Sequence, residues 1–358
     1  MRTLTDYLRD VVERGGSDLH LASNAPPIMR YHGQLVRLTE QPLRPDEVEG
    51  LLYALLEPQQ RDHLYEAKNL DFAHEIELAG ASQRFRVNYY FQKYGVDGVF
   101  RVIPSRVPTM EELGLPDVVA AMTRHHQGLV LVTGPSGSGK TTTLAAMINL
   151  INSEQPKHII TIEDPVEYVH TPRRAVVNQR QVGQHTQGFT RALRAAVRED
   201  PDVILVGELR DLDTIQLAIT ASETGHLVLG TLHTASAAKT VDRIIDAFPA
   251  GQQGQIRIML SESLRGVVSQ QLLPRGDGQG RVAAMEILVG CLPVANMIRE
   301  GKTFQIASIM QTQRHIGMRP MDDAIARLVQ EGKITRQTAY DYAADPKNLE
   351  AQLSGGVH

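Results

Sequence analysis

The stretch LVLVTGPSGSGKTTTLAAMINL, residues 129–150, decides the fold of this 358-residue chain. An apolar run leads into a glycine-rich loop that matches GxxxxGK[ST], and a segment of good helix formers follows. This order of strand, loop and helix is the context in which the motif binds phosphate. Successive backbone N–H groups of such a loop form an anion nest, and the helix adds its N-terminal dipole. The stretch therefore predicts a nucleoside triphosphate site.

The loop assigns ATP and Mg²⁺ to specific residues. Lys140 is placed to bridge the β- and γ-phosphates, and the Thr141 hydroxyl to complete the Mg²⁺ octahedron. The alternative is a glycine-rich turn with a chance lysine, which the matching context disfavours. The other expected nucleotide-binding residues are Gly134, Pro135, Ser136, Gly137, Ser138, Gly139 and Thr142.

Beyond this stretch, short apolar runs alternate with helical patterns, which predicts an α/β, doubly wound domain with helices on both faces of a parallel sheet. From residue 293 onward the pattern is helical, with a hairpin of helices at 321–331 and 335–344 that turns at Gly332. The expected parallel strands are 129–133, 159–163, 203–206, 227–231 and 282–288.

Residues 1–103 predict a separate α+β domain. Few connections between its strands are helical, so its sheet is expected to be largely antiparallel. Prolines crowd the next segment, residues 104–116, which is interpreted as a semi-rigid linker. The domain with the phosphate loop then covers residues 117–290, and a C-terminal helical region covers residues 291–358.

Composition narrows the class of protein. The formal net charge is −4, which disfavours a free-standing nucleic-acid binder. The single cysteine excludes a disulfide framework or a thiolate metal cage within one chain. No apolar run approaches the ~20 residues of a membrane span, so no transmembrane segment is expected. The N-terminus lacks signal-peptide features, and a cytoplasmic protein is predicted.

Two acidic stretches follow predicted strands. Glu163 ends the strand of TIEDPVEY, and the carboxyl ends of parallel strands form the site edge of such sheets. A carboxylate there can polarise a water for attack on the γ-phosphate, although a solvated strand-end turn gives the same pattern. Glu208 ends the strand of DVILVGELRD, where Gly207 replaces the aspartate that normally supports Mg²⁺. Glu208 can act on the metal through water or orient the nucleophile, and both roles stay open.

A third strand, in GHLVLGTLH, is flanked by two histidines. Their spacing is not that of a zinc site, and no cysteine accompanies them. His226 precedes the strand and His233 ends it. His233 is therefore the better candidate for sensing the γ-phosphate, with a purely structural histidine as the alternative.

Four arginines complete the set of candidates. Arg194 and Arg198 are expected on one helix face, four residues apart. Arg86 and Arg101 lie on neighbouring predicted strands of the first domain. By residue type alone, a solvated and salt-bridged surface explains them as well as a catalytic role does.

Several blocks together resemble the secretion ATPases, the hexameric motors of type IV pili and type II secretion. They are GPSGSGKT, TIEDPVEY, REDPDVILVGELRD and TGHLVLGTLHT. The segments GGSDLHL, FRVIP, NMIREGKTFQIASIMQT and GMRPMDDAI resemble the retraction branch, the PilT-like ATPases. The resemblance implies a PAS-like N-terminal domain, a RecA-like C-terminal domain, a homohexamer, and ATP hydrolysis with Mg²⁺.

The resemblance also implies residue roles and partners. Glu163 becomes the water-activating glutamate and Glu208 the Walker B carboxylate, with His226 and His233 as members of the histidine box. Arg86 and Arg101 are implied to face the nucleotide from the first domain, and Arg194 and Arg198 to lie toward the γ-phosphate. The implied partners are an inner-membrane platform protein at the pilus base and, indirectly, the pilin fibre.

Two features bear on the branch. Extension and secretion motors carry a four-cysteine zinc insertion and a longer N-terminal region, which this chain lacks, and this favours retraction. Ala295 replaces the first arginine of the retraction family's AIRNLIRE motif, which leaves an accessory pilus or secretion ATPase as an alternative. A RecA-like nucleic-acid translocase and a nucleotide-gated scaffold are two further interpretations of the same phosphate loop. No basic stripe with interleaved aromatic residues supports the translocase.

Overall fold

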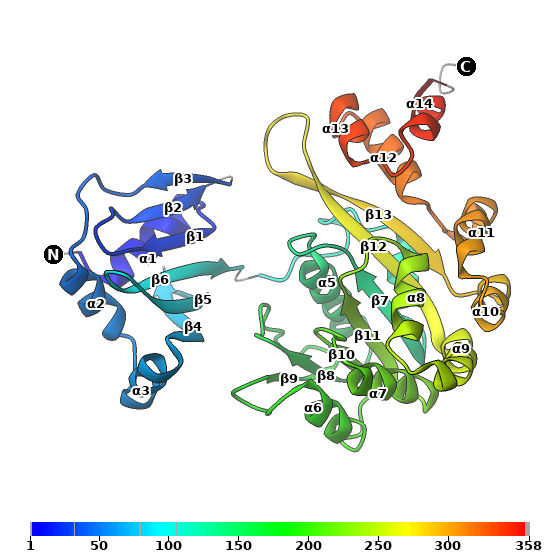
Figure 1. Cartoon of the computed structure of the whole chain (residues 1–358), viewed down its shortest axis with the longest axis horizontal. Coiled ribbons are helices and arrows are strands. Elements are labelled where there is room, and N and C mark those ends of the chain that lie inside the picture. Colours follow the sequence, from blue (N-terminus) through cyan, green and yellow to red (C-terminus); the bar gives the residue numbers. More distant parts are fainter. Residues whose placement is uncertain (1, 32, 79, 105, 355–358) are drawn as a thin grey trace. The chain divides into compact units, whose positions relative to one another are not determined.

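The computed structural model describes residues 2–31, 33–78, 80–104 and 106–354. The chain divides into two compact units, Met1–Arg106 and Val107–His358 (Figure 1). Each unit has its own sheet and its own hydrophobic core.

The first unit is a six-stranded sheet in the order β3-β2-β1-β6-β5-β4, in which every pairing is antiparallel. The antiparallel prediction is therefore confirmed. Its strands are β1 (Asp18–Leu21), β2 (Ile28–Tyr31), β3 (Gln34–Arg37), β4 (Asn69–Leu78), β5 (Ala81–Gln92) and β6 (Gly95–Ile103), and its helices are α1 (Leu4–Glu13), α2 (Pro45–Tyr53) and α3 (Pro58–Ala67).

The helices of the first unit pack against one face of its sheet. Phe85, Tyr89 and Phe100 are completely buried there, together with Leu52 of α2 and Leu64 of α3. Because successive side chains of a strand point to opposite faces, the residues between these aromatics point away from the helices. That second face carries the arginines of β5 and β6.

The segment after β6 belongs partly to the second unit. Met110 and Leu115 are buried in the core that α4 (Asp117–Met122) shares with the large sheet. The second unit begins at Val107, so residues 107–116, expected as linker, are packed on the core of that unit. Apolar side chains between the prolines explain this, because a free linker has nothing to bury them against.

The second unit is built on a seven-stranded sheet in the order β13-β12-β7-β11-β10-β8-β9. All pairings are parallel except the one between β12 and β13. The strands are β7 (Gly128–Thr133), β8 (His158–Glu163), β9 (Val176–Gln181), β10 (Val203–Val206), β11 (Leu227–Leu232), β12 (Leu264–Pro274) and β13 (Arg281–Val289).

The prediction that residues 282–288 form a parallel strand is wrong. β12 and β13 are joined by the short segment 275–280, which is long enough for a hairpin but not for a parallel crossover. β12 itself was not predicted, because Arg265, Ser269 and Gln270 interrupt its apolar pattern. β9 was not predicted either, since it is a half-polar edge strand.

Helices cover both faces of this sheet, as predicted (Figure 1). Val130 and Val132 face the layer of α4 and α5 (Lys140–Glu154), whereas Leu129 and Leu131 face the opposite layer. That opposite layer contains α6 (Phe189–Ala196), α7 (Leu212–Glu223), α8 (Ala237–Asp246), α9 (Ala250–Ser263), α10 (Leu292–Arg299) and α11 (Ile306–Thr312).

The chain ends in helices. The predicted hairpin is present as α12 (Met321–Gln330) and α13 (Arg336–Tyr342). A further helix, α14 (Pro346–Ser354), buries Leu349 and Leu353 against them. The short turns η1 (Thr303–Gln305) and η2 (Arg314–Ile316) precede α11 and α12 respectively.

Candidate nucleotide-binding site

The predicted phosphate loop connects β7 to α5, and its conformation depends on glycine. Gly134, Gly137 and Gly139 have φ angles of 140°, 75° and 88°. A Cβ atom at Gly134 would lie 2.2 Å from the backbone oxygen of Gln270. Gly139 is the N-cap of α5, so the loop leads directly into a helix N-terminus. Pro135, Ser136 and Gly137, at the tip of the loop, are exposed.

Lys140 is drawn into this loop. Its Nζ donates hydrogen bonds to the backbone oxygens of Gly134, at 3.0 Å, and Pro135, at 3.1 Å. Burial lowers the pKa of Lys140, while the negative charges of Glu208 and Glu167 act in the opposite direction. Ser138 Oγ is buried without a hydrogen-bond partner in the protein. The loop thus presents a cation and an unused hydroxyl, which are groups that bind a phosphate.

Gln270 of β12 holds the phosphate loop in place through hydrogen bonds. The sequence analysis did not identify this residue. Its Nε2 donates a hydrogen bond to the backbone oxygen of Ser138, and its Oε1 accepts one from Thr143 Oγ1 at 2.9 Å. A single side chain therefore holds both the loop and the first turn of α5. Its polar position within an apolar strand was the only signal available in the sequence.

The two threonines after Lys140 differ in their surroundings. Thr142 Oγ1 lies 3.1 Å from the hydroxyl oxygen of Tyr168, the last residue of the TIEDPVEY stretch. Thr142 therefore joins α5 to the acidic loop. Thr141, the second residue of α5, is only partly buried.

Glu163 is buried at the carboxyl end of β8. Its Oε1 accepts hydrogen bonds from Thr161 Oγ1, at 2.6 Å, and Gln179 Nε2, at 3.2 Å. Burial raises the pKa of Glu163, because removing a carboxylate from water disfavours its charged form. These hydrogen bonds act in the opposite direction. The carboxyl group is therefore a stronger base than an exposed glutamate.

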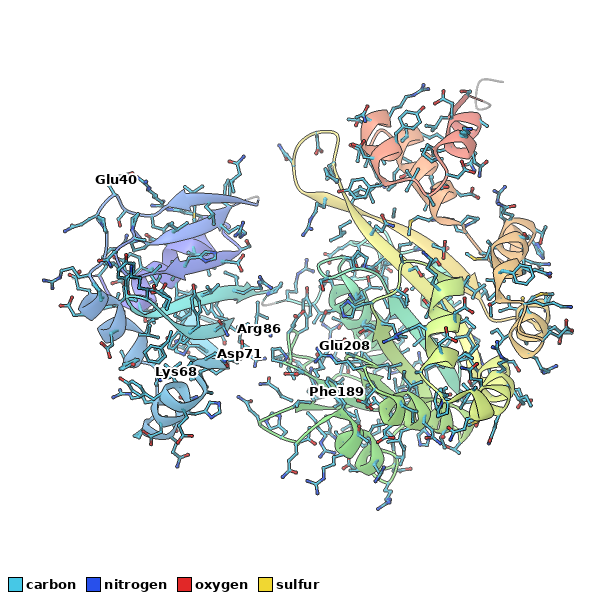
Figure 2. All side chains as sticks on the ribbon, in the orientation of Figure 1. Glu40, Lys68, Asp71, Arg86, Phe189 and Glu208 are labelled. Carbon is cyan, nitrogen blue, oxygen red and sulfur yellow. The ribbon has the colours of Figure 1, made fainter. Side chains whose placement is uncertain are left out.

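Glu208 follows β10 and is the centre of a charged cluster. Arg210 NH2 lies 2.7 Å from Glu208 Oε2, and His233 Nε2 lies 3.4 Å from Glu208 Oε1. Partial burial opposes ionisation, but the hydrogen bonds and the charge of Arg210 outweigh it, so the pKa of Glu208 is lowered. Arg210 was not singled out in the sequence. Figure 2 labels Glu208 together with Phe189, at the start of α6.

The parallel register brings these residues to one edge of the sheet. Val206 pairs with Ile162, and Leu232 pairs with Thr133, directly before the loop. Glu163 is the last residue of β8, whereas Glu208, His233 and the loop follow the carboxyl ends of β10, β11 and β7. The edge that the sequence predicted is thus assembled within one unit.

The structure does not bring His226 to this edge. Its backbone oxygen accepts a hydrogen bond from the backbone N–H of Gly128, at 3.0 Å, where β7 begins. Its Nδ1 lies 3.0 Å from the backbone oxygen of Ala221. Because β11 is parallel to β7, His226 and His233 lie at opposite ends of the same strand.

Arg194 and Arg198 also lie away from the loop within one chain. The prediction that they share a helix face is wrong, because α6 ends at Ala196 and Arg198 lies in the following turn. The ring of Phe189, where α6 begins, is next to Gly207 at the carboxyl edge. From there α6 runs toward the amino edge of the sheet, where β10 begins. Both arginines are exposed.

Arg86 and Arg101 of the first unit lie on the sheet face without helices. Arg86 is directly opposite Arg101 in the pairing of β5 with β6. Arg101 Nε donates a hydrogen bond to Asp18 Oδ1 at 2.9 Å, and Arg86 Nε lies 3.9 Å from Asp71 Oδ1. Figure 2 shows Arg86 and Asp71 on this unit. The Arg101 side chain is still 66% exposed, so it remains open to another group.

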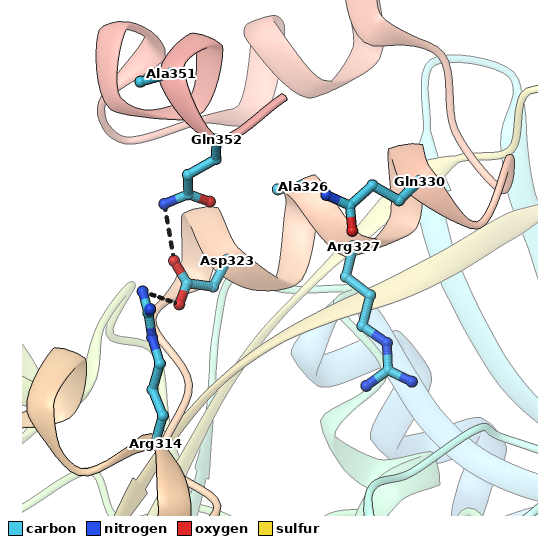
Figure 3. Close-up of a pocket in the computed structure, with 7 residues that line it drawn as sticks. All are labelled: Arg314, Asp323, Ala326, Arg327, Gln330, Ala351 and Gln352. Atoms are coloured by element: carbon cyan, nitrogen blue, oxygen red, sulfur yellow. Dashed lines mark hydrogen bonds and ion pairs between the residues drawn. The ribbon is translucent and has the colours of Figure 1, made fainter. Parts of the chain in front are cut away.

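A shallow pocket of about 370 Å³ lies in the C-terminal helices (Figure 3). Asp323 accepts a hydrogen bond from Gln352 Nε2, at 2.9 Å, and forms an ion pair with Arg314 at 2.6 Å. These contacts join α12, α14 and η2. The pocket has none of the phosphate-loop residues in its lining, so it is separate from the site above.

Neither a membrane span nor a cluster of metal ligands is present in residues 2–31, 33–78, 80–104 and 106–354. No helix in these ranges is long and apolar enough to cross a membrane. No group of three or more histidine, cysteine, aspartate or glutamate side chains in the same ranges is arranged to hold a metal ion.

A doubly wound sheet with a phosphate loop, a buried carboxylate and a second strand-end carboxylate defines a P-loop nucleoside triphosphatase domain. The model of the type II/IV secretion system protein family matches residues 1–347. The chain belongs to this family.

Its relatives include pilus proteins. The type IV pilus retraction ATPase PilT of Pseudomonas aeruginosa is 49% identical over 346 residues, which cover 97% of this chain and 99% of the relative. A twitching motility protein of Neisseria gonorrhoeae is 49% identical over 323 residues, covering 90% of this chain and 86% of the relative. The crystal structure of the pilus retraction motor PilT with bound ADP superposes with a TM-score of 0.90, at 44% identity, and covers 98% of this chain and 99% of the other.

Proposed function

We propose that this protein is an ATPase that powers the retraction of type IV pili, and thereby twitching motility. The observation that carries the proposal is the single sheet edge at which Lys140, Glu163 and Glu208 meet the phosphate loop. The extent of the similarity to PilT supports the cellular role, since the alignment spans nearly the full length of both chains.

ATP is expected to bind with its phosphates inside the loop. The ammonium group of Lys140 would exchange its hydrogen bonds to the backbone oxygens of Gly134 and Pro135 for bonds to the triphosphate. The phosphate oxygens would also accept hydrogen bonds from backbone N–H groups between Ser136 and Thr141. The buried and unpartnered Ser138 Oγ fits such a ligand. Thr142 contributes by holding α5 to the acidic loop.

Mg²⁺ fits the donors at this edge, because Thr141 and Glu208 offer a hydroxyl and a carboxylate oxygen, the ligand type that Mg²⁺ prefers. When bound, the ion neutralises charge on the β- and γ-phosphates. Glu208 is held in its charged form by Arg210 and His233, which suits a carboxylate that acts toward a cation through water.

Hydrolysis needs a base for the attacking water, and Glu163 is assigned to it. The buried carboxyl has a raised pKa and accepts hydrogen bonds that orient it. It would take the proton from water as the oxygen attacks the γ-phosphorus and the bond to the β–γ bridging oxygen breaks. Lys140 would stabilise the charge that develops on the ADP leaving group. His233, which lies 3.4 Å from Glu208, would respond to the loss of the γ-phosphate.

We extend the proposal to the assembly: the first unit is PAS-like, the second RecA-like, and six copies form a ring. The exposed tip of the phosphate loop supports this, since within one chain no described helix of the second unit covers it. Arg86 and Arg101 would supply positive charge to the γ-phosphate from the first unit of the same or a neighbouring subunit. Arg194, Arg198 and His226 would act only across subunits.

The partners follow from the proposed role. We place the protein in the cytoplasm at the inner-membrane base of the pilus, where it would act on a platform protein and through it on the pilin fibre. No nucleic acid is expected as a partner, since the net charge of −4 provides no basic surplus.

The proposal is tested in two assays. A deletion strain complemented with this gene should recover pilus retraction, and the same gene carrying Glu163→Gln should not, although its product still binds ATP. Normal retraction with Glu163→Gln, or hydrolysis that requires single-stranded DNA, would contradict the proposal.

The contribution of the first unit has its own test. Arg101→Ala should assemble and bind ATP but hydrolyse it slowly, because arginine supply to a phosphoryl group is worth ~10³–10⁵ in rate. Arg84→Ala is the matched control, since Arg84 lies on the same face of β5 and is paired with Glu75. Equal turnover in the two variants would show that the first unit does not act on the nucleotide.

A further inference from the structure

Glu286 of β13 connects two helices that are far apart in the sequence. Its Oε1 accepts a hydrogen bond from the backbone N–H of Ala237 at 2.6 Å. The next residue, Ile287, exchanges backbone hydrogen bonds of 2.8 and 2.9 Å with Arg319, two residues before Met321. The backbone N–H of Met321 lowers the pKa of the Glu286 carboxyl group, against a burial that raises it. Ala237 is the first residue of α8, and Met321 is the first residue of α12. The carboxylate of Glu286 therefore binds the N-terminus of α8 and lies beside the N-terminus of α12.

Neither helix can satisfy these groups by itself. The N-cap of α12 is Pro320, which has no side chain to cap the helix, and the N-cap Ser236 of α8 accepts its hydrogen bond from Lys239 instead. The first backbone N–H groups of a helix need an acceptor and favour negative charge. Glu286 supplies both from a partly buried position.

On the sheet, Glu286 is linked to the strand that precedes the phosphate loop. It is directly opposite Ser269 of β12, whose Oγ lies 2.8 Å from Thr133 Oγ1. Thr133 immediately precedes Gly134, the first residue of the loop. The next residue of β12, Gln270, holds the loop and α5.

On the helix side, α8 is linked to the histidine that contacts Glu208. Only residues 234–236 separate His233 from α8. Thr234 Oγ1 lies 2.7 Å from Thr240 Oγ1, which in turn lies 3.5 Å from Thr133 Oγ1. A shift of His233 would therefore move the N-terminus of α8, and with it the group that Glu286 binds.

We propose that Glu286 is a positioning residue that transmits the nucleotide state of the phosphate site from residues 233–236 and α8 to α12 and the helices packed on it. This inference rests on the proposed function, because it needs ATP at the loop. The C-terminal helices would then follow hydrolysis through one shared carboxylate.

The chain has no tryptophan, so the fluorescence of a single introduced tryptophan reports on the surroundings of that one position. Tyr342→Trp puts it on α13, which packs against α12, at a side chain that is 40% exposed. In the full-length protein with only this change, its emission should differ between ADP and a non-hydrolysable ATP analogue. Nucleotide affinity is measured in parallel with a fluorescent nucleotide.

Two variants break the link from opposite sides. Glu286→Gln keeps the shape of the side chain but removes its negative charge from between the N-termini of α8 and α12. Ala237→Pro removes the α8 donor at the first helical position, which tolerates proline. Glu331→Gln is the matched control. It also removes a carboxylate next to α12, but at the C-terminal end of the helix, where Glu331 forms ion pairs with Arg327 and Lys333.

We expect both linking variants to bind the two nucleotides with unchanged affinity and to lose the difference in emission, whereas the control keeps it. Gel filtration and thermal unfolding identify any variant that does not fold, and the remaining one then decides. A difference that persists in a folded linking variant overturns the inference. The inference is also overturned if the reporter alone shows no difference while both nucleotides bind. Failure of the reporter protein to bind nucleotide at all would instead overturn the proposed function.

Discussion

The two edges of the seven-stranded sheet contain similar residue types but differ in what those residues contact. At the carboxyl edge, His233 Nε2 lies 3.4 Å from Glu208 Oε1. The negative charge of Glu208 in turn acts on Lys140, in the phosphate loop with the exposed tip. At the amino edge, His226 and His158 lie against backbone oxygens of neighbouring turns. Six-residue strands separate the two edges by roughly 20 Å. The comparison teaches that residue type selects candidates, whereas the strand end at which a residue lies decides which of them can meet a phosphate.

The largest expected effect is at Lys140. Lys140→Ala should reduce ATP hydrolysis below detection and weaken ATP binding, because no other residue of the loop supplies a positive charge. Lys157→Ala is the matched control from the amino edge, directly before β8, and should keep normal turnover. A phosphate-release assay with thermal unfolding of both variants checks this. Near-normal hydrolysis by Lys140→Ala would contradict the assignment of the loop.

The next effect separates the two carboxylates of the carboxyl edge. Glu163→Gln should keep ATP affinity while turnover falls by at least ~100-fold, the low end of what a general base contributes. Glu208→Ala should instead raise the Mg²⁺ concentration that is needed for half-maximal turnover. Steady-state kinetics over a Mg²⁺ titration distinguishes the two. If the two phenotypes were exchanged, the roles of Glu163 and Glu208 would be exchanged as well.

The two histidines of β11 compare the edges directly. His233→Ala should lower turnover by about 10-fold, the size expected for losing a hydrogen bond to a charged group. His226→Ala should leave turnover per subunit nearly unchanged when subunits are kept dilute and unassembled. A larger loss with His226→Ala than with His233→Ala in that state would show that the amino edge takes part in hydrolysis within one chain.

The smallest expected effect is a shift in the pH dependence of kcat/KM. Thr161 donates a hydrogen bond to Glu163 and so stabilises its ionised form, against a burial that raises the pKa. The base acts when it is deprotonated, so activity is lost as the pH falls through this pKa. Thr161→Val should raise the pKa further and move the acid limb of kcat/KM to higher pH. An acid limb that stays in place, or moves to lower pH, would show that another group controls it.

Much of the carboxyl edge could be predicted because its signals are local. The loop motif, the strand before it and the helix after it are adjacent in the sequence, and the acids at 163 and 208 each follow an apolar strand. Since parallel strands place their carboxyl ends together, adjacency in the sequence was enough to predict proximity in space. The antiparallel sheet of the first unit followed in the same way from its short connections.

The residues that escaped prediction act over long separations in the sequence. Gln270 supports a loop that lies about 130 residues earlier, as the hydrogen bond to Ser138 shows. Its strand was missed because the polar side chains that serve the site interrupt the apolar pattern. Arg198 was placed on a helix that ends two residues before it, because helical spacing does not indicate where a helix stops.

The sequence by itself determined the class of site, the strand-loop-helix unit and the acids beside it, because backbone geometry and local spacing specify these features. Only the tertiary structure decided that Glu208 contacts Arg210 and His233 together, that residues 107–116 pack on the second unit, and that Glu286 lies between the N-termini of α8 and α12. These facts depend on which strand ends and helix N-termini come into contact, and such contacts are set by packing between residues far apart in the chain.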